Sequence, residues 1–513
     1  MHLSSPARLA RRAAAAALAC LLLAGCSRPA VLQPASSEEA SSSAASSSAG
    51  AAQSQPARFA IAVSEGNYNP YLAANTLTEQ VASLVFEKLV RISPRMELEM
   101  RLAESVQSAG NTVTIILRSG CTFADGTPIT ANDVAASLLA AKASSFYAGR
   151  LSNMTSVQAV GDSMVQLTLA SPDSLFGYLL DLPVMKAAEV SAPQPTPSGR
   201  YTYGSEENTL TLNPRAPFPE DGPGTIWLTP VSDYAELVSQ LAMGEISFYL
   251  AEESAASAVA TSENYFRTNT LLFLGVNSGS SNPLCNTSQG RAALSAALSR
   301  QDLSDRFAST SPATGALNGL YECVRGQQVI SSEPDSNGLT ADLAALGYSW
   351  NQEAGRYENA AGQPASVNIL VCGSSADRVY SARLLQQQWT EAGIQVTLTQ
   401  AEDFSAYLQI IQDRQFELYI GEMKLYNNID LSPFWSGSAR YGLAVTQQLL
   451  DAYNLMRADS SAAGAFEALF AEQMPYIPLL WRGGVTVSNR RTSGVVSSVS
   501  DLYYSLASLS LTE

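Results

Sequence analysis

Polar side chains suited to ligand binding gather in residues 422–430, which read EMKLYNNID. Tyr426, Asn427 and Asn428 offer one aromatic ring and two amides, groups that commonly orient a polar organic ligand in a pocket. Asp430 adds a carboxylate at the end of the run, and Glu422 supplies another at its start. These are candidate ligand groups, and solvated loop charges are an equal alternative for Glu422 and Asp430.

The usual catalytic residue sets are largely missing. His2 is the single histidine and lies in the N-terminal leader, so triads with a histidine base and histidine metal sites are excluded for the exported chain. Lys88, Lys142, Lys186 and Lys424 complete no S-x-x-K motif, and neither a phosphate-binding loop nor a dinucleotide glycine fingerprint occurs. We expect no cofactor and no enzyme activity. A hydrolase with two catalytic carboxylates stays open, because acidic residues are plentiful.

The N-terminus has the pattern of an export signal. Three arginines precede an apolar run at residues 13–24, which is too short to span a bilayer. The run ends in Leu-Ala-Gly-Cys and resembles a bacterial lipobox, which makes Cys26 the expected lipidation site. A plain signal peptide is the alternative. Residues 26–58, rich in Ala and Ser, predict a flexible tether between the membrane and the folded part.

Length, composition and net charge limit the classes of protein to which this chain can belong. The 513 residues are enough for two or three domains, and a content of 46% hydrophobic and 15% charged residues allows a large core. The 30 basic residues against 46 acidic ones give a net charge of −16. Nucleic acid is an unexpected partner, because phosphate binding requires basic surface.

Four cysteines remain beyond the leader and the lipobox: Cys121, Cys285, Cys323 and Cys372. An even number in an exported chain allows up to two disulfides, with three possible pairings. Cys285 and Cys323 lie in loop-like sequence and are the preferred pair, although buried free thiols fit equally well. The chain has no C-x-x-C motif, so we expect no metal site built on paired cysteines.

The clearest local pattern runs from residue 111 to residue 139. Alternating apolar residues at 112–117 predict a half-buried strand. Asp125-Gly126 predicts a turn, and Thr130 with Asp133 forms the pattern of a capping box. A helix should begin at Thr130 and pack back on the strand.

This stretch, with FADGTPITANDV at residues 123–134, closely resembles the signature of solute-binding protein family 5, the oligopeptide-binding receptors of ABC importers. Residues 102–105 (LAES), 291–300 (RAALSAALSR) and 474–481 (MPYIPLLW) resemble further family segments in the same order. The resemblance implies a two-lobed α/β fold of the periplasmic-binding-protein type, class II-like, with three subdomains, mixed sheets and a ligand cleft between the lobes.

On this basis we assign five units. They are a leader at 1–25, a tether at 26–58, a lobe 1 main subdomain at 59–72 with 198–270 and 475–513, a lobe 1 accessory subdomain at 73–197, and lobe 2 at 271–474.

The resemblance also implies ligand contacts. By position, Ala74, Asn75 and Thr76 correspond to an extended segment that pairs with the ligand, and Tyr426, Asn427, Asn428 and Asp430 to the second one. Peptide-binding members place an aspartate in that second loop to meet the ligand's ammonium group, and here Leu425 occupies its position. Asn277, at the end of a buried apolar run, is a further candidate, either for the ligand or for the hinge between the lobes.

The expected function is capture of an extracellular peptide or peptide-like solute and its delivery to ABC permease subunits. Loss of the aspartate leaves an oligosaccharide or a metal chelate open as cargo. A secreted hydrolase and a sensor lipoprotein are the alternatives from other classes. The expected location is extracytoplasmic, with a lipid anchor in the cell membrane.

Overall fold

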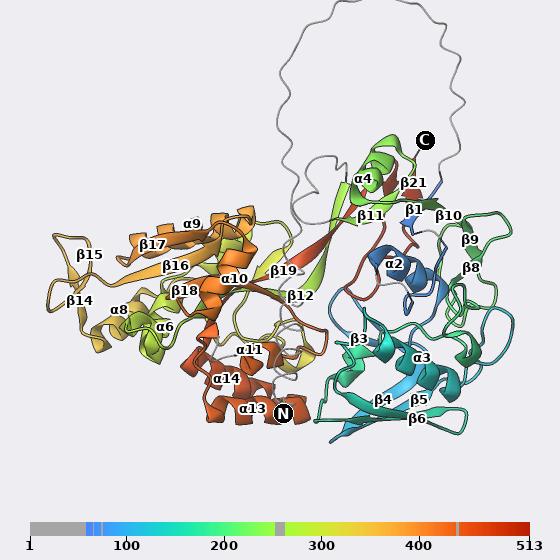
Figure 1. Ribbon diagram of the computed structural model, residues 1–513, viewed down its shortest axis with the longest axis horizontal. Coiled ribbons are helices and arrows are strands. Elements are labelled where there is room, and N and C mark those ends of the chain that lie inside the picture. Colours follow the sequence, from blue (N-terminus) through green and yellow to red (C-terminus); the bar gives the residue numbers. More distant parts are fainter. Residues whose placement is uncertain (1–57, 65, 73–74, 252–261, 438–440, 513) are drawn as a thin grey trace, which may run out of the picture.

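The computed structural model describes residues 58–64, 66–72, 75–251, 262–437 and 441–512. They form two α/β lobes that lie side by side (Figure 1). The predicted fold class is confirmed. Cys26 and Ala74 lie outside the described residues. Within the described ranges, every helix is too short or too polar to cross a membrane.

One sheet of 11 strands runs through both lobes. Its order is β17-β16-β18-β12-β19-β11-β1-β10-β9-β8, and β13 pairs with β19. The lobe 1 strands are β1 (Ala60–Val63), β8 (Tyr201–Tyr203), β9 (Thr209–Leu212), β10 (Thr225–Pro230) and β11 (Phe248–Ala251). The lobe 2 strands are β13 (Thr310–Pro312), β16 (Ser366–Cys372), β17 (Gln395–Ala401) and β18 (Leu418–Lys424).

Two long antiparallel strands, β12 (Ser262–Val276) and β19 (Tyr476–Ser488), cross from one lobe to the other (Figure 1). In lobe 1, β19 pairs with β11, and in lobe 2, β12 pairs with β18 and β19 pairs with β13. Their pairing register shifts between Arg267 and Thr270. Opposite this shift, a Cβ on Gly483 would lie 2.6 Å from the Phe266 carbonyl oxygen, so only glycine fits. The irregular pairing marks the place where the two lobes can bend relative to each other.

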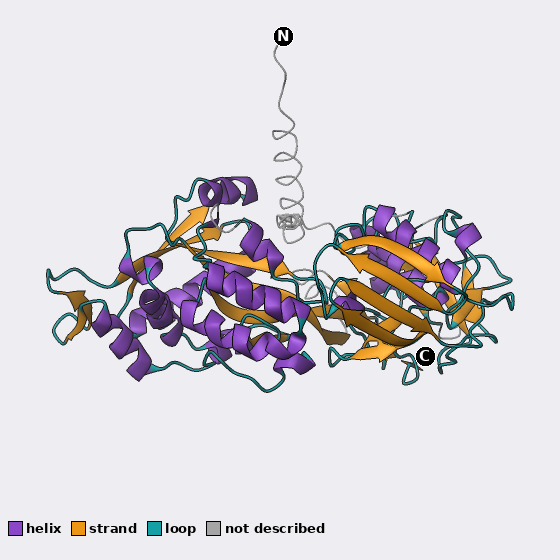
Figure 2. Cartoon of the chain, turned by 90° about the horizontal axis from the view of Figure 1, so that it is seen from below, coloured by secondary structure: helices purple, strands orange, loops and turns teal. Residues whose placement is uncertain are grey.

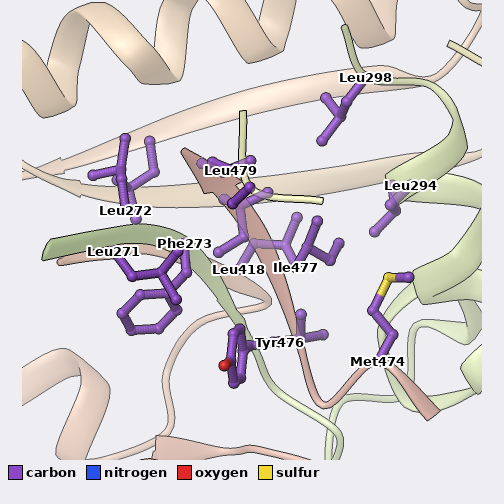
Figure 3. Packing of buried hydrophobic residues seen from close by; sticks show 14 of the residues in the cluster. Leu271, Leu272, Phe273, Leu294, Leu298, Leu418, Met474, Tyr476, Ile477 and Leu479 are labelled. Carbon is purple, nitrogen blue, oxygen red and sulfur yellow. The ribbon is translucent and has the colours of Figure 1, made fainter. Parts of the chain in front are cut away.

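Lobe 2 is built on parallel βαβ units. β16 pairs in parallel with both β17 and β18, and the connections run through α9 (Ala376–Glu391) and α10 (Phe404–Gln412). Leu271, Phe273, Leu418 and Ile477 form the centre of the lobe 2 core, where the crossing strands meet β18 (Figure 3). The other helices are α5 (Pro283–Asn286), α6 (Ser288–Ala296), α7 (Arg300–Asp305), α8 (Ser336–Ala345), α11 (Ser432–Ser436), α13 (Gln447–Ala458) and α14 (Ala463–Gln473).

Lobe 1 carries a second, antiparallel sheet in the order β4-β5-β7-β6. This accessory sheet lies on the lower side of the lobe and faces the viewer in Figure 2. Its strands are β4 (Ala103–Ala109), β5 (Thr112–Leu117), β6 (Met154–Val160) and β7 (Met164–Leu169), and the lobe's helices are α2 (Thr76–Val85), α3 (Ala131–Ala143) and α4 (Tyr234–Met243). Small hairpins pair β2 (Val90–Ile92) with β3 (Leu98–Met100), β14 (Tyr348–Asn351) with β15 (Arg356–Asn359), and β20 (Thr492–Ser493) with β21 (Ser510–Leu511).

The strand, turn and capped helix predicted around residue 125 are confirmed. β5 begins at Thr112, Gly126 has a φ of 88°, and Thr130 caps α3 through a complete capping box with Asp133. The second oxygen of Asp133 also accepts a hydrogen bond from the backbone N–H of Ala187 at 2.9 Å. This carboxylate therefore joins the helix start to the segment that follows the accessory sheet.

Two expectations need correction. All four described cysteines are free, so the disulfide between Cys285 and Cys323 is not formed. Cys285 is buried in α5 beside Arg291, whereas Cys323 lies in the short 3-10 turn Glu322–Val324 near Tyr178, so the two thiols have different neighbours. The closing strand also differs from the assigned boundary at residue 475. The part of β19 from Tyr476 to Arg482 packs in lobe 2, because its apolar side chains complete that core.

Replacing Asp133 with alanine should lower the free energy of unfolding by about 1 to 2 kcal/mol, because the cap and the Ala187 contact are lost together. Urea denaturation measures the change. Asp162→Ala is the matched control, because Asp162 is an aspartate of the same subdomain whose side chain is exposed. Equal stability of the two variants would contradict the role of the cap.

Candidate functional site between the lobes

The two lobes contact each other through a buried ion pair. Asp173 of lobe 1 pairs with Arg457 on α13 of lobe 2. Asn428 donates a hydrogen bond to Asp173 at 2.7 Å, Arg457 donates to the Asn428 carbonyl at 2.6 Å, and the Ser174 N–H donates to the Arg457 carbonyl at 2.7 Å. Burial raises the pKa of Asp173, and the Arg457 guanidinium opposes that rise. We call Asp173, Asn428 and Arg457 the interlobe lock.

Two further contacts lie across the same interface. The rings of Tyr178 and Tyr321 are 5.1 Å apart, and the exposed pair Arg325 and Glu97 is separated by 3.3 Å. Figure 1 shows the crossing strands at the upper end of the interface and α13 at its lower end. The lobes are thus joined by the crossing strands at one end and by noncovalent contacts at the other.

A cluster of aromatic and charged side chains from lobe 1 adjoins this interface. Tyr147 donates a hydrogen bond to Glu79 Oε1 at 3.2 Å, and its ring meets the Tyr71 ring edge-on at 5.5 Å. Arg150, three residues beyond Tyr147, forms an ion pair with Asp181. We call Tyr71, Glu79, Tyr147, Arg150 and Asp181 the lobe 1 cluster.

Lobe 2 contributes Tyr426 to the cluster. Its hydroxyl lies so close to Gly149 that a Cβ there would approach it to 2.5 Å, which explains the glycine. The charge of Arg150 acts on Tyr426 and lowers its pKa, although burial raises that pKa by more. The side chains of both lobes therefore meet at one polar place, as required for a solute that both lobes hold.

Burial dominates the electrostatics of the cluster. It lowers the pKa of Arg150, while Tyr147 and Glu79 act in the opposite direction. It raises the pKa of Tyr147 well above the usual value, and Glu79 adds to that rise. The cluster combines one guanidinium, two carboxyl groups and two phenols, a set that can bind a polar or charged solute.

Asparagine side chains hold in place the loop of lobe 2 that carries Tyr426. The Tyr321 hydroxyl donates to the Asn427 carbonyl at 2.6 Å, and Asn269 Nδ2 lies 3.2 Å from Asn427 Oδ1. Asn318 in turn donates to Asn269 at 3.2 Å. This network fixes the loop that carries Tyr426.

A buried carboxylate on α14 positions the backbone segment that leads to Asn318. Glu467 accepts hydrogen bonds from the N–H groups of Ala316 at 2.9 Å and Leu317 at 2.7 Å, just before Asn318. A Cβ on Gly315 would lie 2.5 Å from this carboxylate, so the loop backbone packs directly on it. Burial raises the pKa of Glu467 to about 7, and the two N–H donors only partly offset that rise.

The residues near positions 75 and 426 that were predicted to contact the ligand lie in different surroundings. Asn75 caps α2 by accepting a hydrogen bond from Thr78 N–H, and Thr76 is the exposed first residue of that helix. Tyr426 lies at the interface, and Asn427 is held in the lobe 2 wall. Ligand contact by Asn75, Thr76, Tyr426 and Asn427 stays a prediction.

Three other predicted residues have structural partners. Asn428 belongs to the interlobe lock. Asp430 accepts hydrogen bonds from the Tyr453 hydroxyl and the Ser432 N–H, and so starts α11. Asn277 holds the carbonyls of Arg414 and Phe416 at the end of β12 that is distant from the register shift. The expectation of a hinge role for Asn277 was therefore wrong, because apolar periodicity gives the end of a strand but not which end adjoins the other lobe.

The position of the missing aspartate is apolar in the fold as well. Leu425 is 4% exposed, and its N–H donates to the Asn269 carbonyl. Glu422, the carboxylate at the start of the run 422–430, forms an ion pair with Arg482 at 3.1 Å.

Sequence reasoning missed Glu79, Tyr147, Arg150, Asp173 and Arg457. Each occurs singly, with no motif spacing around it. Their common feature is burial of a charge or a phenol, which a single sequence does not display. The run SSFYAGR at residues 144–150, before β6, has two aromatic residues and an arginine in a loop and was the one available signal.

A small apolar pocket of about 40 Å³ lies within lobe 2 between α10, α11 and β18. Phe273, Tyr419, Met423, Phe434 and Leu443 are among its lining residues. Across the described ranges, no group of three or more His, Cys, Asp or Glu side chains is placed to hold a metal ion.

Comparison with known proteins identifies the family. The model of the bacterial extracellular solute-binding proteins, family 5, matches residues 97–437, about two thirds of the chain. The chain belongs to this family. Family 5 proteins bind solutes for ABC importers.

Individual similarities are more limited. The glutathione-binding protein GsiB of Escherichia coli K12 is 33% identical over 143 residues, which are 27% of each chain. The match thus spans about a quarter of the length of this curated relative. A nickel ABC transporter structure from Bacillus halodurans has a TM-score of 0.70 at 18% identity, covering 89% of this chain and 100% of that one. The oligopeptide-binding protein AppA of Bacillus subtilis, in complex with a nonapeptide, has a TM-score of 0.51 at 16% identity, covering 89% and 99%.

The free energy of unfolding should fall as the pH rises from about 4.5 to about 7, by up to about 3 kcal/mol from Glu467 alone. The folded protein keeps a proton on Glu467 in this range, whereas the unfolded chain releases it, so rising pH favours unfolding. Urea denaturation at several pH values measures the slope. Glu467→Gln should remove this part of the slope, and an unchanged slope in that variant would refute the assignment.

Removing the lock carboxylate by Asp173→Ala should leave Arg457 buried without its partner, at a cost of about 3 to 5 kcal/mol in the closed form. We expect the lobes to separate, which small-angle X-ray scattering would detect as a larger radius of gyration.

Glu97→Gln is the matched control, because it breaks an exposed ion pair across the same interface and should change little. A radius of gyration equal to that of the unmodified protein in both variants would show that the lock does not hold the lobes together.

Proposed function

We propose that this protein captures a peptide or peptide-like solute between its lobes and delivers it to the permease of an ABC importer. The observation that carries the proposal is the lobe 1 cluster beside Tyr426 of lobe 2. A guanidinium, carboxylates and phenols there suit the charged and polar groups of a short peptide. GsiB and AppA, by their names, bind glutathione and a nonapeptide, and both ligands belong to this class.

Closure of the lobes would be the working step. A solute that touches both lobes stabilises the closed form relative to the open one, and the permease can then distinguish the loaded receptor. The interlobe lock adds a contact that exists only when the lobes meet. ATP hydrolysis would belong to the partner subunits, and the protein itself would act without catalysis.

Membrane attachment completes the proposal. Acyl chains on Cys26 would anchor the protein outside the cytoplasm, and residues 26–58 would let it reach the permease. The unit boundaries at 72, 197 and 270 belong to the same proposal.

A metal chelate is the second candidate. Leu425 in place of the aspartate favours a solute without a free peptide amine at that point, and the Bacillus halodurans structure is of a nickel transporter. Since His2 is the only histidine, the metal would have to arrive with its own chelating ligand.

A thermal-shift screen of the purified protein tests the proposal. Peptides of two to six residues form one set, and oligosaccharides and nickel–histidine complexes form two comparison sets. A solute at 100 times its dissociation constant should stabilise the protein by about 2.7 kcal/mol, a shift of a few degrees. Stabilisation by peptides alone supports the proposal.

Stabilisation by a comparison set alone would replace the peptide by that cargo, and the absence of any shift would overturn the proposal. Tyr426→Ala should weaken the response to the active solute. Tyr380→Ala is the matched control, because this exposed tyrosine of lobe 2 lies on α9 and packs on Phe307.

A further inference from the structure

The apolar pocket of lobe 2 contains a buried arginine without a partner. Arg378, the third residue of α9, lines the pocket and is 4% exposed. Among the described residues, none forms an ion pair with its guanidinium or accepts a hydrogen bond from it. A guanidinium can donate five hydrogen bonds, and burying one without an acceptor is costly. An anion in the pocket would supply the missing acceptor.

The two carboxylates associated with this pocket both pair with another arginine. Arg482 pairs with Asp377 at 3.3 Å and with Glu422 at 3.1 Å. Asp377 directly precedes Arg378 in α9, and Glu422 lines the pocket together with Arg378. Both carboxylates are therefore engaged, and Arg378 is the cation of this group that is left for a solute.

The position of the pocket in the sheet also favours an anion. The parallel strands β16, β17 and β18 end at one edge, and α9 begins there, directly after β16. Open α/β sheets bind ligands at this edge. The first turn of a helix leaves backbone N–H groups without intrahelical partners and carries partial positive charge. In the described part of the chain, the N-cap residue Ser375 makes no capping hydrogen bond through its side chain.

The rest of the lining is apolar and largely aromatic. A Cβ on Gly421 would overlap the Phe273 ring, and a Cβ on Gly275 would overlap the Tyr419 ring, so both rings pack directly on glycine backbone. The pocket of about 40 Å³ has room for about three waters, a volume that suits a chain of three or four carbon atoms. The lining can therefore bury a short hydrocarbon chain beside the guanidinium.

We propose that the pocket of lobe 2 binds a short apolar monocarboxylate, with its carboxylate on Arg378 and its hydrocarbon chain between α10 and β18. The ligand class is that of the short-chain fatty acids. An amino acid head fits poorly, because Glu422, the acidic residue of the lining, is engaged by Arg482. Each lining residue belongs to lobe 2, so this site goes beyond the proposed peptide capture and does not depend on it.

A homologous series of acids tests the proposal. Acetate, propionate, butyrate, pentanoate, hexanoate and octanoate are titrated into the full chain at constant ionic strength, and ligand-observed NMR gives each dissociation constant. Affinity should rise about fourfold with each added methylene and stop rising near pentanoate, when the pocket is full. An affinity that is independent of chain length, or that rises unchanged to octanoate, would overturn the proposal.

Two analogues of butyrate test the role of charge. Butyramide has nearly the same shape without the charge, and n-butylamine carries the opposite charge. Butyrate should bind at least tenfold more tightly than either, because hydrogen bonds to charged groups are the strong ones. Equal binding of butyrate and butyramide, or no binding of any acid, would refute the site.

A substitution connects the preference for the acid to its residue. Arg378→Gln should bind butyrate and butyramide equally. Arg383→Gln is the matched control, since Arg383 is exposed on the same helix, and it should keep the full preference. A preference retained in the folded Arg378→Gln variant would contradict the assignment. Should Arg378→Gln fail to fold, the acids and analogues still decide on the unmodified protein.

Filling the pocket tests where the chain of the acid lies. Leu408 lines the pocket from α10, and Leu408→Phe should weaken butyrate more than acetate, because acetate needs less room. Leu455→Phe makes the same change at a position on α13 that is 59% exposed, and it should leave both affinities unchanged. Unchanged binding of butyrate to Leu408→Phe would place the acid elsewhere and overturn the proposal.

Discussion

The antiparallel pairing of β12 with β19 is the constraint on which the rest of the structure depends. These two strands belong to both halves of one sheet, so the cores of the two lobes are fixed to a shared ladder of hydrogen bonds. Register shifts between Arg267 and Thr270, opposite Gly483, and between Leu272 and Phe273 interrupt the ladder. The pairing is therefore irregular where the strands pass from lobe 1 into the lobe 2 core.

Closure depends on the contacts that form between the two lobes. Asp173 and Arg457 lie far apart in the sequence and form a buried ion pair only when the lobes are together. Burying such a pair costs desolvation energy, which is offset only when the charged groups have good hydrogen-bond partners; here Asn428 and the Leu175 N–H donate to the Asp173 carboxylate. The same interface brings Tyr426 of lobe 2 to the lobe 1 cluster.

The replacement of an aspartate by Leu425 fits this arrangement. Leu425 is buried, and the nearby carboxylates Glu422 and Asp430 hold Arg482 and the start of α11. The loop after β18 therefore serves mainly to position Tyr426 and Asn427. The charge that acts on Tyr426 lies instead in lobe 1, at Arg150.

The sequence by itself determined the family, the two-lobed fold and the local units, because these depend on contiguous patterns. The capping box at Thr130 and Asp133 and the β16–α9–β17 unit needed only short-range periodicity and side chains a few residues apart. Only the tertiary structure decided which charges are buried and which partners they have. Asn277 was misplaced and Arg150 was missed for this reason: a side chain's burial and partners are set by segments that are distant in sequence, and their approach depends on the packing of the whole chain.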